Sequence, residues 1–454
     1  MTEFPVPRIV HAFATRFSNA GYCLYIVGGA VRDFLLNRLN TDYDFTTDAE
    51  PQQVMKLFRS VIPTGIQHGT VTVLFQGSSF EVTTFRTEAG YTDRRHPDTV
   101  HFVRSLAEDL KRRDFTMNAL AADAITGSII DYHKGKEDIE QRIIRAIGDP
   151  HKRFSEDALR ILRGCRFAAQ LGFSIESDTA AAMADLATHL RYVSGERIRT
   201  ELLKILESPI PSQGFLALHA CGALAVILPE LSQGDQVAQK GAHQLDVMHH
   251  GIAACDAVPR HRPLVRLAAL LHDIGKVETK RMADDGEVTF HRHEALSAKM
   301  AQNILSRLKF SNDEKSTVIN LINNHMFHYT PDWSDGAVRR FVKRVGKHAL
   351  EDVFMLRLAD QMATDHQQRP QQILALKQRI ADVLQESTAL SIKDLAINGN
   401  DLAALGIPKG PTMGIILNQL LETVLDDPHQ NTVETLSTIA QNFYTIRIKE
   451  PQEH

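Results

Sequence analysis

Residues 24 to 45 read LYIVGGAVRDFLLNRLNTDYDF. The apolar run from Leu24 to Val27 predicts a buried strand, Gly28-Gly29 a tight turn, and the residues from Ala30 to Leu39 a helix. Backbone N–H groups at the start of such a helix form an anion site, and Arg32 in its first turn adds positive charge. The segment therefore predicts a cradle for phosphate.

Two aspartates, Asp42 and Asp44, close this stretch at alternate positions. On an extended strand, side chains two residues apart point to the same face, so the two carboxylates would project together. Converging carboxylates repel, and a divalent cation such as Mg²⁺ keeps both ionised. Glu81, on a strand one hairpin away, is either a third metal ligand or an exposed strand glutamate. A phosphate cradle beside a carboxylate pair is typical of nucleotidyl transfer, with Asp42 and Asp44 as its catalytic residues.

The composition is that of a globular protein: of 454 residues, 43% are hydrophobic and 23% charged, with a net charge of −4. This length predicts about three domains. Because no apolar run approaches the ~18 residues of a membrane span and no signal pattern opens the chain, we expect a cytoplasmic protein without membrane contact. The four cysteines form no CxxC pair and are expected to be buried free thiols. A nucleic-acid partner would need local basic patches.

The pattern of elements changes along the chain. Residues 20 to 135 alternate strands and helices, with a hairpin predicted from residues 70–75 and 80–85. Beyond residue 137 the apolar spacing is helical, as in residues 158–171, 179–190, 197–206, 264–271 and 295–308. The sequence therefore predicts an α+β fold: an N-terminal α/β head with a mixed or antiparallel sheet, followed by a long all-α body.

A second basic cluster lies between these regions, at Lys111-Arg112-Arg113-Asp114-Phe115-Thr116-Met117-Asn118. Its cations suit a triphosphate, and Asp114 and Asn118 suit a ribose, although a solvated basic helix end is the alternative. The polar segment from Arg86 to Pro97 is interpreted as a mobile loop that gates the site.

Four ordered motifs within roughly the first 210 residues resemble the class II tRNA nucleotidyltransferases, a family that includes CCA-adding enzymes and bacterial poly(A) polymerases. The motifs are Gly28 to Asp33, Asp42-Tyr43-Asp44, Lys111 to Ala119, and Arg153 to Arg160. The resemblance implies that the aspartate pair holds Mg²⁺, that the arginine-rich motif recognises ribose, and that a Glu-Asp-x-x-Arg motif reads the incoming base without a template. The nucleotide-binding residues expected on this basis are Gly28, Gly29, Arg32, Arg113, Asp114, Asn118, Asp157, Arg160, Arg163 and Arg166.

Asp157 and Arg160 are the base-reading pair in this interpretation. They lie three residues apart on a predicted helix, hence on neighbouring points of one face. A carboxylate supplies acceptors and a guanidinium supplies donors, which together match the Watson–Crick edge of cytosine or adenine. An ordinary helix salt bridge is the alternative.

A second chemical centre is predicted in the segment from Leu270 to Lys276. Its adjacent pair, His272-Asp273, lies at the end of a predicted apolar helix. One histidine precedes this pair, further histidines follow it, and an aspartate comes last. This order of residues along the chain resembles that of the HD phosphohydrolase superfamily. The ligand set implied is His250, His272, Asp273, His293, His325 and Asp360, with His249 and His291 as alternatives to their near neighbours. Such donors suit a transition metal such as Ni²⁺, Mn²⁺ or Co²⁺. The resemblance implies phosphatase, 2′-nucleotidase or 2′,3′-cyclic phosphodiesterase activity.

Near the C-terminus, Asp401 and Thr412 are predicted helix caps, and Gly410-Pro411-Thr412 could donate backbone N–H groups to an RNA phosphate. This segment resembles the tRNA-contacting end of bacterial CCA-adding enzymes. The predicted domains are a nucleotidyltransferase head (1–140), a helical neck (141–210), an HD-type metal-binding domain (211–390) and a tRNA-binding tail (391–454).

The leading functional hypothesis is the addition of C, C and A to tRNA 3′ ends from CTP and ATP, by a monomer or homodimer. An enzyme that adds only the terminal A and a poly(A) polymerase are close alternatives. Gly65 to Thr70 resembles the CCA-type segment and disfavours polyadenylation. From a different class, the chain could be an HD metallophosphohydrolase whose head only binds RNA or nucleotide, but the intact pair Asp42 and Asp44 disfavours a non-catalytic head.

Overall fold

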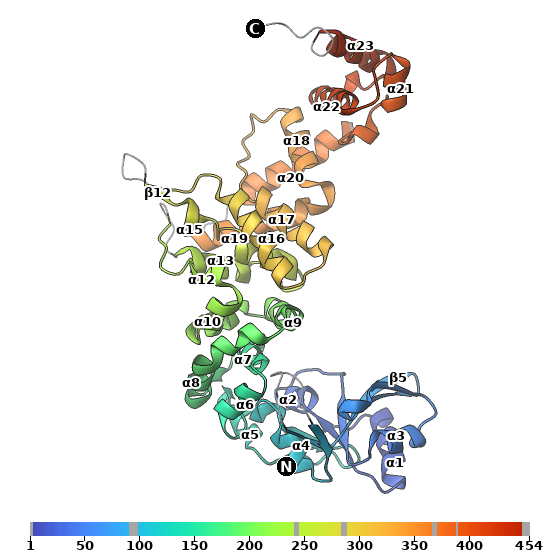
Figure 1. Cartoon of the computed structure of the whole chain (residues 1–454), viewed down its shortest axis with the longest axis vertical. Coiled ribbons are helices and arrows are strands. Elements are labelled where there is room, and N and C mark those ends of the chain that lie inside the picture. The colour runs from blue at the N-terminus through green and yellow to red at the C-terminus, as the bar shows by residue number, and fades with distance from the viewer. Residues whose placement is uncertain are drawn as a thin grey trace. The chain divides into compact units, whose positions relative to one another are not determined.

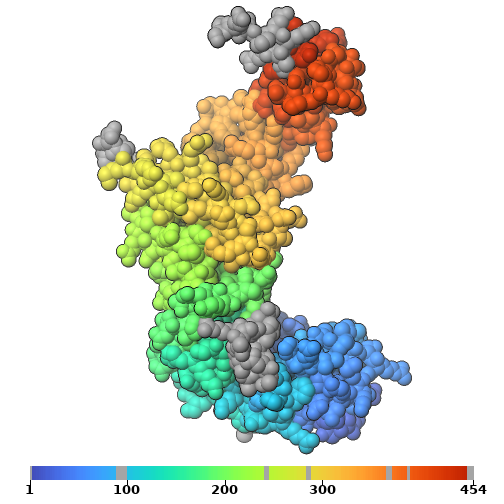
Figure 2. Space-filling model, in the orientation of Figure 1, coloured from blue at the N-terminus to red at the C-terminus, as the bar shows by residue number. Residues whose placement is uncertain are grey.

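The computed structural model describes residues 3–89, 99–239, 245–282, 288–365, 370–386 and 389–446. The chain forms two compact units. The first consists of Met1–Gln233 and Ile304–Phe310, and the second of Gly234–Asn303 and Ser311–His454. Apart from the short 304–310 segment, the first unit is coloured from blue to green in Figures 1 and 2, and the second from yellow-green to red.

A seven-stranded sheet forms the head of the first unit, in the order β3-β4-β5-β2-β1-β8-β9. Its strands are β1 (Leu24–Val27), β2 (Asp44–Thr47), β3 (Val61–Gly65), β4 (Thr70–Phe75), β5 (Ser78–Thr84), β8 (Leu120–Asp123) and β9 (Ile129–Asp131). Strands β2 and β5 pair in parallel, whereas the other neighbours pair antiparallel. The mixed sheet followed by a helical body confirms the predicted fold class.

Helix α1 (Arg8–Asn19) packs on this sheet, although the sequence interpretation had not singled it out (Figure 1). Its buried positions Val10, Phe13, Ala14 and Phe17 recur at helical spacing. The ring of Phe13 lies 5.4 Å from that of Phe45 in β2 and 4.7 Å from that of Phe80 in β5, measured between centroids. This aromatic cluster anchors the two strands that carry the predicted metal ligands.

The β4–β5 hairpin turns at Gln76 and Gly77, which both have positive φ, 49° and 82°. Two such residues make the turn whose twist matches paired strands. The predicted hairpin is therefore confirmed, with a shorter turn than the sequence suggested.

Two local predictions about the head need correction. Helix α2 spans only Gly29–Leu35, because Asn37 takes a left-handed conformation (φ 54°) that ends the helix before Leu39. The predicted gating loop begins instead as a strand, β6 (Arg86–Ala89), paired antiparallel with β7 (Thr99–Phe102). The rest of that loop, residues 90–98, lies outside the described residues.

The first unit continues in a series of helices. They are α6 (Pro150–Glu156), α7 (Leu159–Leu171), α8 (Ser177–Leu186), α9 (Gly195–Leu206) and α10 (Pro211–Ala220). The second unit contains α13 (Val247–Ala257), α14 (Pro263–Leu271), α16 (His293–Arg307), α17 (Asn312–Asn324), α18 (Asp335–Val345), α19 (Leu350–Asp365) and α20 (Pro370–Glu386). The helices predicted from apolar spacing are thus confirmed. The division into four domains stays a prediction.

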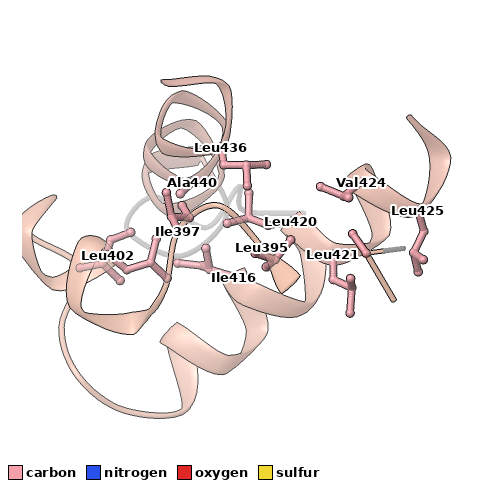
Figure 3. Close-up of a cluster of buried hydrophobic side chains, with 12 residues drawn as sticks. Leu395, Ile397, Leu402, Ile416, Leu420, Leu421, Val424, Leu425, Leu436 and Ala440 are labelled. Atoms are coloured by element: carbon pink, nitrogen blue, oxygen red, sulfur yellow. The ribbon is translucent and has the colours of Figure 1, made fainter. Parts of the chain in front are cut away.

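The second unit ends in α21 (Gly399–Ala404), α22 (Pro411–Asp426) and α23 (Val433–Tyr444), which share an apolar cluster (Figure 3). Ile416 and Leu420 of α22 meet Leu436 and Ala440 of α23 there, all fully buried. No helix among the described residues is long and apolar enough to cross a bilayer.

The predicted caps of these helices were wrong in detail. Asn398 is the N-cap of α21, and Asp401 completes a capping box by accepting a bond from the Asn398 N–H at 2.7 Å. Helix α22 starts at Pro411 after Gly410, so Thr412 lies inside the helix. Proline takes the first helical position because its fixed φ fits the helix and it has no N–H to satisfy.

Candidate nucleotide cleft and metal-ligand cluster

A cleft of about 1080 Å³ opens within the first unit, between the sheet and helices α7 and α9. It collects every residue predicted for the nucleotide site. These lining residues are Gly28, Gly29, Arg32, Asp42, Asp44, Glu81, Arg113, Asp114, Asn118, Asp157, Arg160, Arg163 and Arg166. Residues that the sequence interpretation missed also line it, notably Arg197 and Lys204.

Three carboxylates meet at one side of the cleft. Asp44 is the first residue of β2 and lies in register with Glu81 of the parallel neighbour β5. Asp42 precedes the strand, where its N–H donates to the Asn40 side chain at 2.8 Å, so the expected two-aspartate strand is wrong although both aspartates line the cleft. Burial and the charge of Asp42 raise the pKa of Asp44, against the influence of Arg113. Burial, Asp44 and Asp42 raise the pKa of Glu81. Mutual repulsion of this kind fits a site for a divalent cation.

Arg113 lies next to the glycine turn. Gly28 has a φ of 71°, and a Cβ at that position would lie 3.5 Å from the Arg113 guanidinium. The fully buried Asp109 accepts from Arg112 at 2.8 Å and lies 3.5 Å from Arg113, which holds both cations at the edge of the cleft. Asp109 was not predicted, and its helix-compatible spacing to the two arginines, three and four residues, was the available signal.

Asp114, Asn118 and Arg32 form a connected polar network. Asn118 donates to Asp114 at 3.1 Å and accepts from Arg32 at 2.7 Å. Arg163 of α7 donates to the other oxygen of Asp114 at 2.7 Å. Burial would raise the pKa of Asp114, but Arg163, Asn118 and the Phe115 N–H lower it to about 2. Asp114 is therefore a fixed carboxylate that joins the head to α7.

Arg166, one helical turn further along α7, lies against Phe167 and Glu201. Its guanidinium is 4.3 Å from the ring centroid of Phe167 and 3.2 Å from a Glu201 carboxylate oxygen. Arg32 and Arg163 also lie near this ring, at 5.2 and 5.8 Å. Burial, opposed by Glu201, lowers the pKa of Arg166 to about 10, which leaves it charged at neutral pH.

The expectation that Asp157 and Arg160 share one helix is wrong. Asp157 has extended backbone angles (φ −147°, ψ 104°) between α6 and α7, and its side chain accepts from the Leu159 N–H at 3.1 Å. Its other oxygen accepts from Arg197 of α9 at 2.6 Å, whereas Arg160 bonds to Glu156 at 2.9 Å. The two residues still line the same cleft.

In the second unit, the six predicted HD-type ligands come together from separate segments. They are His250 in α13, His272 at the end of α14, the adjacent Asp273, His293 at the start of α16, His325 at the end of α17 and Asp360 in α19. All are buried, at most 8% exposed. Two groups of three, His250–His272–Asp273 and Asp273–His293–His325, each bring ligand atoms within 4.8 Å of one another.

Backbone carbonyls orient three of these rings. The Nδ1 atoms of His272, His293 and His325 lie 2.7, 2.9 and 2.7 Å from the carbonyl oxygens three residues earlier. Their Nε2 atoms are buried without a hydrogen-bond partner, as is one oxygen of Asp273. That oxygen is 3.1 Å from Nε2 of His293 and 3.9 Å from that of His325. Orphaned nitrogen and oxygen atoms that converge in this way fit a transition metal, with the carbonyls as the outer partners that fix each ring.

Cations hold the opposite side of each carboxylate. Lys276 lies 2.6 Å from the second oxygen of Asp273, and Arg357 lies 2.8 Å from that of Asp360. Burial opposes ionisation, yet His272 and Lys276 keep the pKa of Asp273 well below its usual range. His249 instead contacts Asp246 at 2.9 Å, so the structure places His250, and not His249, in the cluster.

Sequence models of three families match the chain. They describe a poly A polymerase head domain (residues 24–145), a probable RNA- and SrmB-binding site of polymerase A (172–234) and a putative tRNA nucleotidyltransferase domain 2 (290–440). A polymerase-type head followed by these helical segments defines the class of tRNA nucleotidyltransferases and poly(A) polymerases.

Curated relatives narrow that class. The CCA-adding enzyme of Limosilactobacillus fermentum is 35% identical over 425 residues, which cover 93% of each chain. The chain therefore belongs to the family of CCA-adding enzymes. The enzyme of Lactobacillus helveticus is 54% identical over 197 residues, 43% of this chain and 49% of that one. In this match and in others that cover only part of the chain, the chain spans about half the length of the curated relatives.

Solved structures share the whole fold. The crystal structure of the Bacillus stearothermophilus CCA-adding enzyme in complex with CTP is 29% identical, with a TM-score of 0.73 over 99% of this chain and 100% of that one. The Thermotoga maritima enzyme complexed with tRNA is 20% identical, with a TM-score of 0.58 over 96% and 94% of the two chains, and shows the likeness of fold alone.

Proposed function

We propose that this chain adds C, C and A to the 3′ ends of tRNA, taking the nucleotides from CTP and ATP. The observation that carries the proposal is that the carboxylates of Asp42, Asp44 and Glu81 line the same cleft as Arg32 and Arg113. That arrangement offers ligands for Mg²⁺ and positive charge for a triphosphate in one place. Family membership supports the same conclusion.

The chemistry is an in-line displacement at phosphorus. The 3′-hydroxyl oxygen of the RNA forms a bond to the α-phosphorus, the bond from that phosphorus to the bridging oxygen breaks, and pyrophosphate leaves while the hydroxyl proton is released. Mg²⁺ held by Asp42 and Asp44, with Glu81 as a third ligand, would supply a lowered hydroxyl pKa and charge neutralisation when bound. Arg32 and Arg113 neutralise charge on the triphosphate and leaving group. No covalent intermediate with the protein is needed.

Recognition of the nucleotide is assigned to the other residues of the cleft. Asp114 and Asn118 contact the ribose, and Arg163 and Arg166 keep this side of the cleft positively charged. Following the resemblance of the Glu-Asp-x-x-Arg motif, Asp157 and Arg160 face the base.

The test is to sequence the products formed on tRNA that lacks its 3′ end, with CTP and ATP both present. Wild-type protein is expected to append C, C and A and then stop, while Asp42→Ala appends nothing. Addition of A only to tRNA ending in CC would identify an A-adding enzyme, and long A tails would identify a poly(A) polymerase. Equal incorporation by wild type and Asp42→Ala would overturn the assignment of the carboxylates.

We also propose that the cluster around Asp273 is a metal-dependent phosphohydrolase site. The orphaned Nε2 atoms of His272, His293 and His325 favour this second function, since buried imidazole nitrogens without partners are costly unless they bind a ligand. Ni²⁺, Mn²⁺ or Co²⁺ bound by the six residues would supply an activated water for attack on a phosphoester. The substrates in view are a 2′,3′-cyclic phosphate, a 2′-nucleotide and a simple phosphomonoester.

Hydrolysis of 2′,3′-cyclic AMP after loading with each metal in turn tests this proposal. Wild type is expected to hydrolyse the substrate and to show a metal-dependent rise in unfolding temperature. Asp273→Asn is expected to show neither hydrolysis nor the rise. His249→Ala is the matched control because His249 lies outside the cluster. A metal-dependent rise that Asp273→Asn retains in full would discard the cluster as the site.

The remaining assignments belong to the same proposal. The tail from residue 391, with the start of α22 at Gly410 and Pro411, contacts tRNA, and the protein works in the cytoplasm as a monomer or homodimer. Light scattering of the protein with and without tRNA measures the oligomeric state.

A further inference from the structure

We propose that Cys165 and Cys221 are a modification site: a small uncharged disulfide oxidises the two thiols to an internal disulfide, which lowers the activity of the nucleotide cleft. This inference rests on the proposed nucleotide addition and adds a reversible control to it. Both residues carry free thiols in the structure. Neither is among the described residues that line the cleft or form the histidine cluster.

The two thiols contact each other between packed helices. Cys165 lies in α7 and is fully buried, and Cys221 directly follows α10 and is 7% exposed. The Cys165 S–H donates to the Cys221 sulfur, and the Cys221 S–H donates to the Leu218 carbonyl at 3.6 Å. Two cysteines that already touch can be bridged without a large movement of the backbone.

The helices that carry these thiols approach each other closely at Gly214 of α10. A Cβ at Gly214 would lie 3.0 Å from the Cβ of Ala169 and 3.2 Å from the carbonyl oxygen of Cys165, both in α7. The two helices therefore have no spare space between them at this point. Because a close-packed interior transmits strain, a new bond between α7 and α10 shifts the helices themselves.

Cys221 can be reached through a cavity of about 450 Å³ beside α7, α8 and α10. Its lining includes Phe173, Ile175, Met183, Leu216, Ala217 and Cys221. No charged side chain is among the described residues that line it. A small uncharged disulfide is therefore the class of oxidant that fits the cavity, since a charged one would lose its hydration there without gaining a partner.

The two thiols differ in their readiness to react. The hydrogen bond from Cys165 lowers the pKa of the Cys221 thiol, against the effect of burial. Burial, together with the same hydrogen bond, raises the pKa of the Cys165 thiol. Because the thiolate is the nucleophile in disulfide exchange, Cys221 attacks first.

The exchange takes two steps. The Cys221 thiolate forms a bond to one sulfur of the small disulfide, whose S–S bond breaks, and the first thiol leaves after it takes up a proton. Cys165 then gives up its proton to solvent, its sulfur bonds to the Cys221 sulfur, and the second thiol leaves in the same way. The two cysteines lose two electrons and two protons in total, and the small disulfide gains both.

The new bond acts on the cleft through α7. Arg163 and Arg166 flank Cys165 in that helix and line the cleft, and Arg163 donates to Asp114 at 2.7 Å. A disulfide brings its sulfur atoms to about 2.05 Å, closer than two hydrogen-bonded thiols, so α7 is drawn toward the end of α10. A displacement of about 1 Å can cost a reaction site about 100-fold in rate.

The experiment oxidises the full-length protein with bis(2-hydroxyethyl) disulfide, an uncharged probe, and blocks the remaining thiols with N-ethylmaleimide. Peptide mass mapping without reductant should find Cys165 linked to Cys221. Incorporation of labelled CTP into tRNA that lacks its 3′ end should fall about 10- to 100-fold and should return after treatment with dithiothreitol.

Three variants separate the linked pair from the other thiols. Cys221→Ser should give no linked peptide and should keep its incorporation after oxidation. Cys165→Ala should stop after the first step and carry the probe as a mixed disulfide on Cys221. Cys23→Ser is the matched control, because Cys23 is exposed and outside the pair, and this variant should form the link and lose incorporation as wild type does.

The inference is overturned if no link between Cys165 and Cys221 forms, if the linked protein incorporates CTP as fast as the reduced protein, or if Cys221→Ser loses incorporation on oxidation as wild type does. Failure of the proposed function gives a different result: reduced wild type then extends no tRNA. In that case the linked peptide, together with CTP binding before and after oxidation, decides the role of the pair.

Discussion

Asp44 lies in register with Glu81 and two residues after Asp42. Each of these carboxylates gains from a bound cation and is under repulsion without one. The pKa of Asp44 is raised in the folded, metal-free protein, which means that folding favours its protonated form. The stability that protonated Asp44 contributes is therefore lost as the pH rises through the folded pKa.

Asp44→Asn should therefore separate stability from activity. At neutral pH and without metal, the variant should unfold at a higher temperature than wild type because one repelling charge is gone. Nucleotide incorporation should fall by more than about 100-fold, the upper range for loss of even an outer-shell partner of a metal. Calorimetry with and without Mg²⁺, together with incorporation of labelled CTP, gives both quantities.

Asp48→Asn is the control for that substitution, because Asp48 accepts from the Cys23 N–H at 2.8 Å and does not line the cleft. Its incorporation should stay near wild type. An Asp44→Asn protein that retained wild-type incorporation would rule out Asp44 as a metal ligand.

At the scale of elements, helix α7 joins the head to the helices that follow it. Arg163 and Arg166, three residues apart on one face, both line the cleft, and Arg163 reaches Asp114 of the head. Asp114 is buried and Arg163 partly exposed in this ion pair, so removal of one partner leaves the other charge uncompensated.

Asp114→Asn should destabilise the protein in a pH-dependent way. The pKa of Asp114 falls from 3.8 to about 2 on folding, which corresponds to about 2 kcal/mol of stability. Because the folded pKa is the lower one, this contribution is complete well above pH 4 and is lost as pH falls toward 2. Urea unfolding at pH 7 and pH 3 should show a difference between wild type and variant that is about half as large at pH 3. A difference that does not change with pH would contradict the ion-pair account.

The C-terminal cluster of α22 and α23 provides a prediction about packing (Figure 3). Leu420 is fully buried there, and Leu420→Ala should cost about 2–5 kcal/mol in local stability. Hydrogen exchange should show faster exchange in both helices. Binding of CTP, which is proposed for the cleft of the first unit, should be unchanged. Protection in α23 equal to wild type would mean that the two helices do not support each other through this cluster.

On the scale of the whole molecule, the two candidate sites belong to different compact units. Each unit builds its site from its own residues: the carboxylates and arginines of the cleft lie in the first, and the histidine cluster in the second. This separation makes the two proposed activities independent at the level of side chains.

Paired variants test that independence. Asp42→Ala should abolish nucleotide addition and keep hydrolysis of 2′,3′-cyclic AMP, whereas His272→Ala should abolish hydrolysis and keep addition. Both activities are measured on the same preparation of each full-length variant, with circular dichroism as the check on folding. Loss of both activities in a folded variant would show that the units are coupled.

The sequence by itself determined the features that depend on neighbours along the chain. The turn at Gly28-Gly29 and the hairpin that carries Glu81 reflect local backbone preferences, which short stretches express without help from the rest of the protein. The helical spacing beyond residue 137 predicted the body of the molecule for the same reason.

Only the tertiary structure decided which distant residues meet. Parallel pairing of β2 and β5 sets Glu81 beside Asp44, the extended residue Asp157 turns away from Arg160 toward Arg197, and His250 reaches Asp360 110 positions later. Contacts of this range depend on how whole elements pack, and a buried donor or acceptor takes whichever partner that packing brings within reach. The spacing of residues along the chain does not show which distant residues become partners.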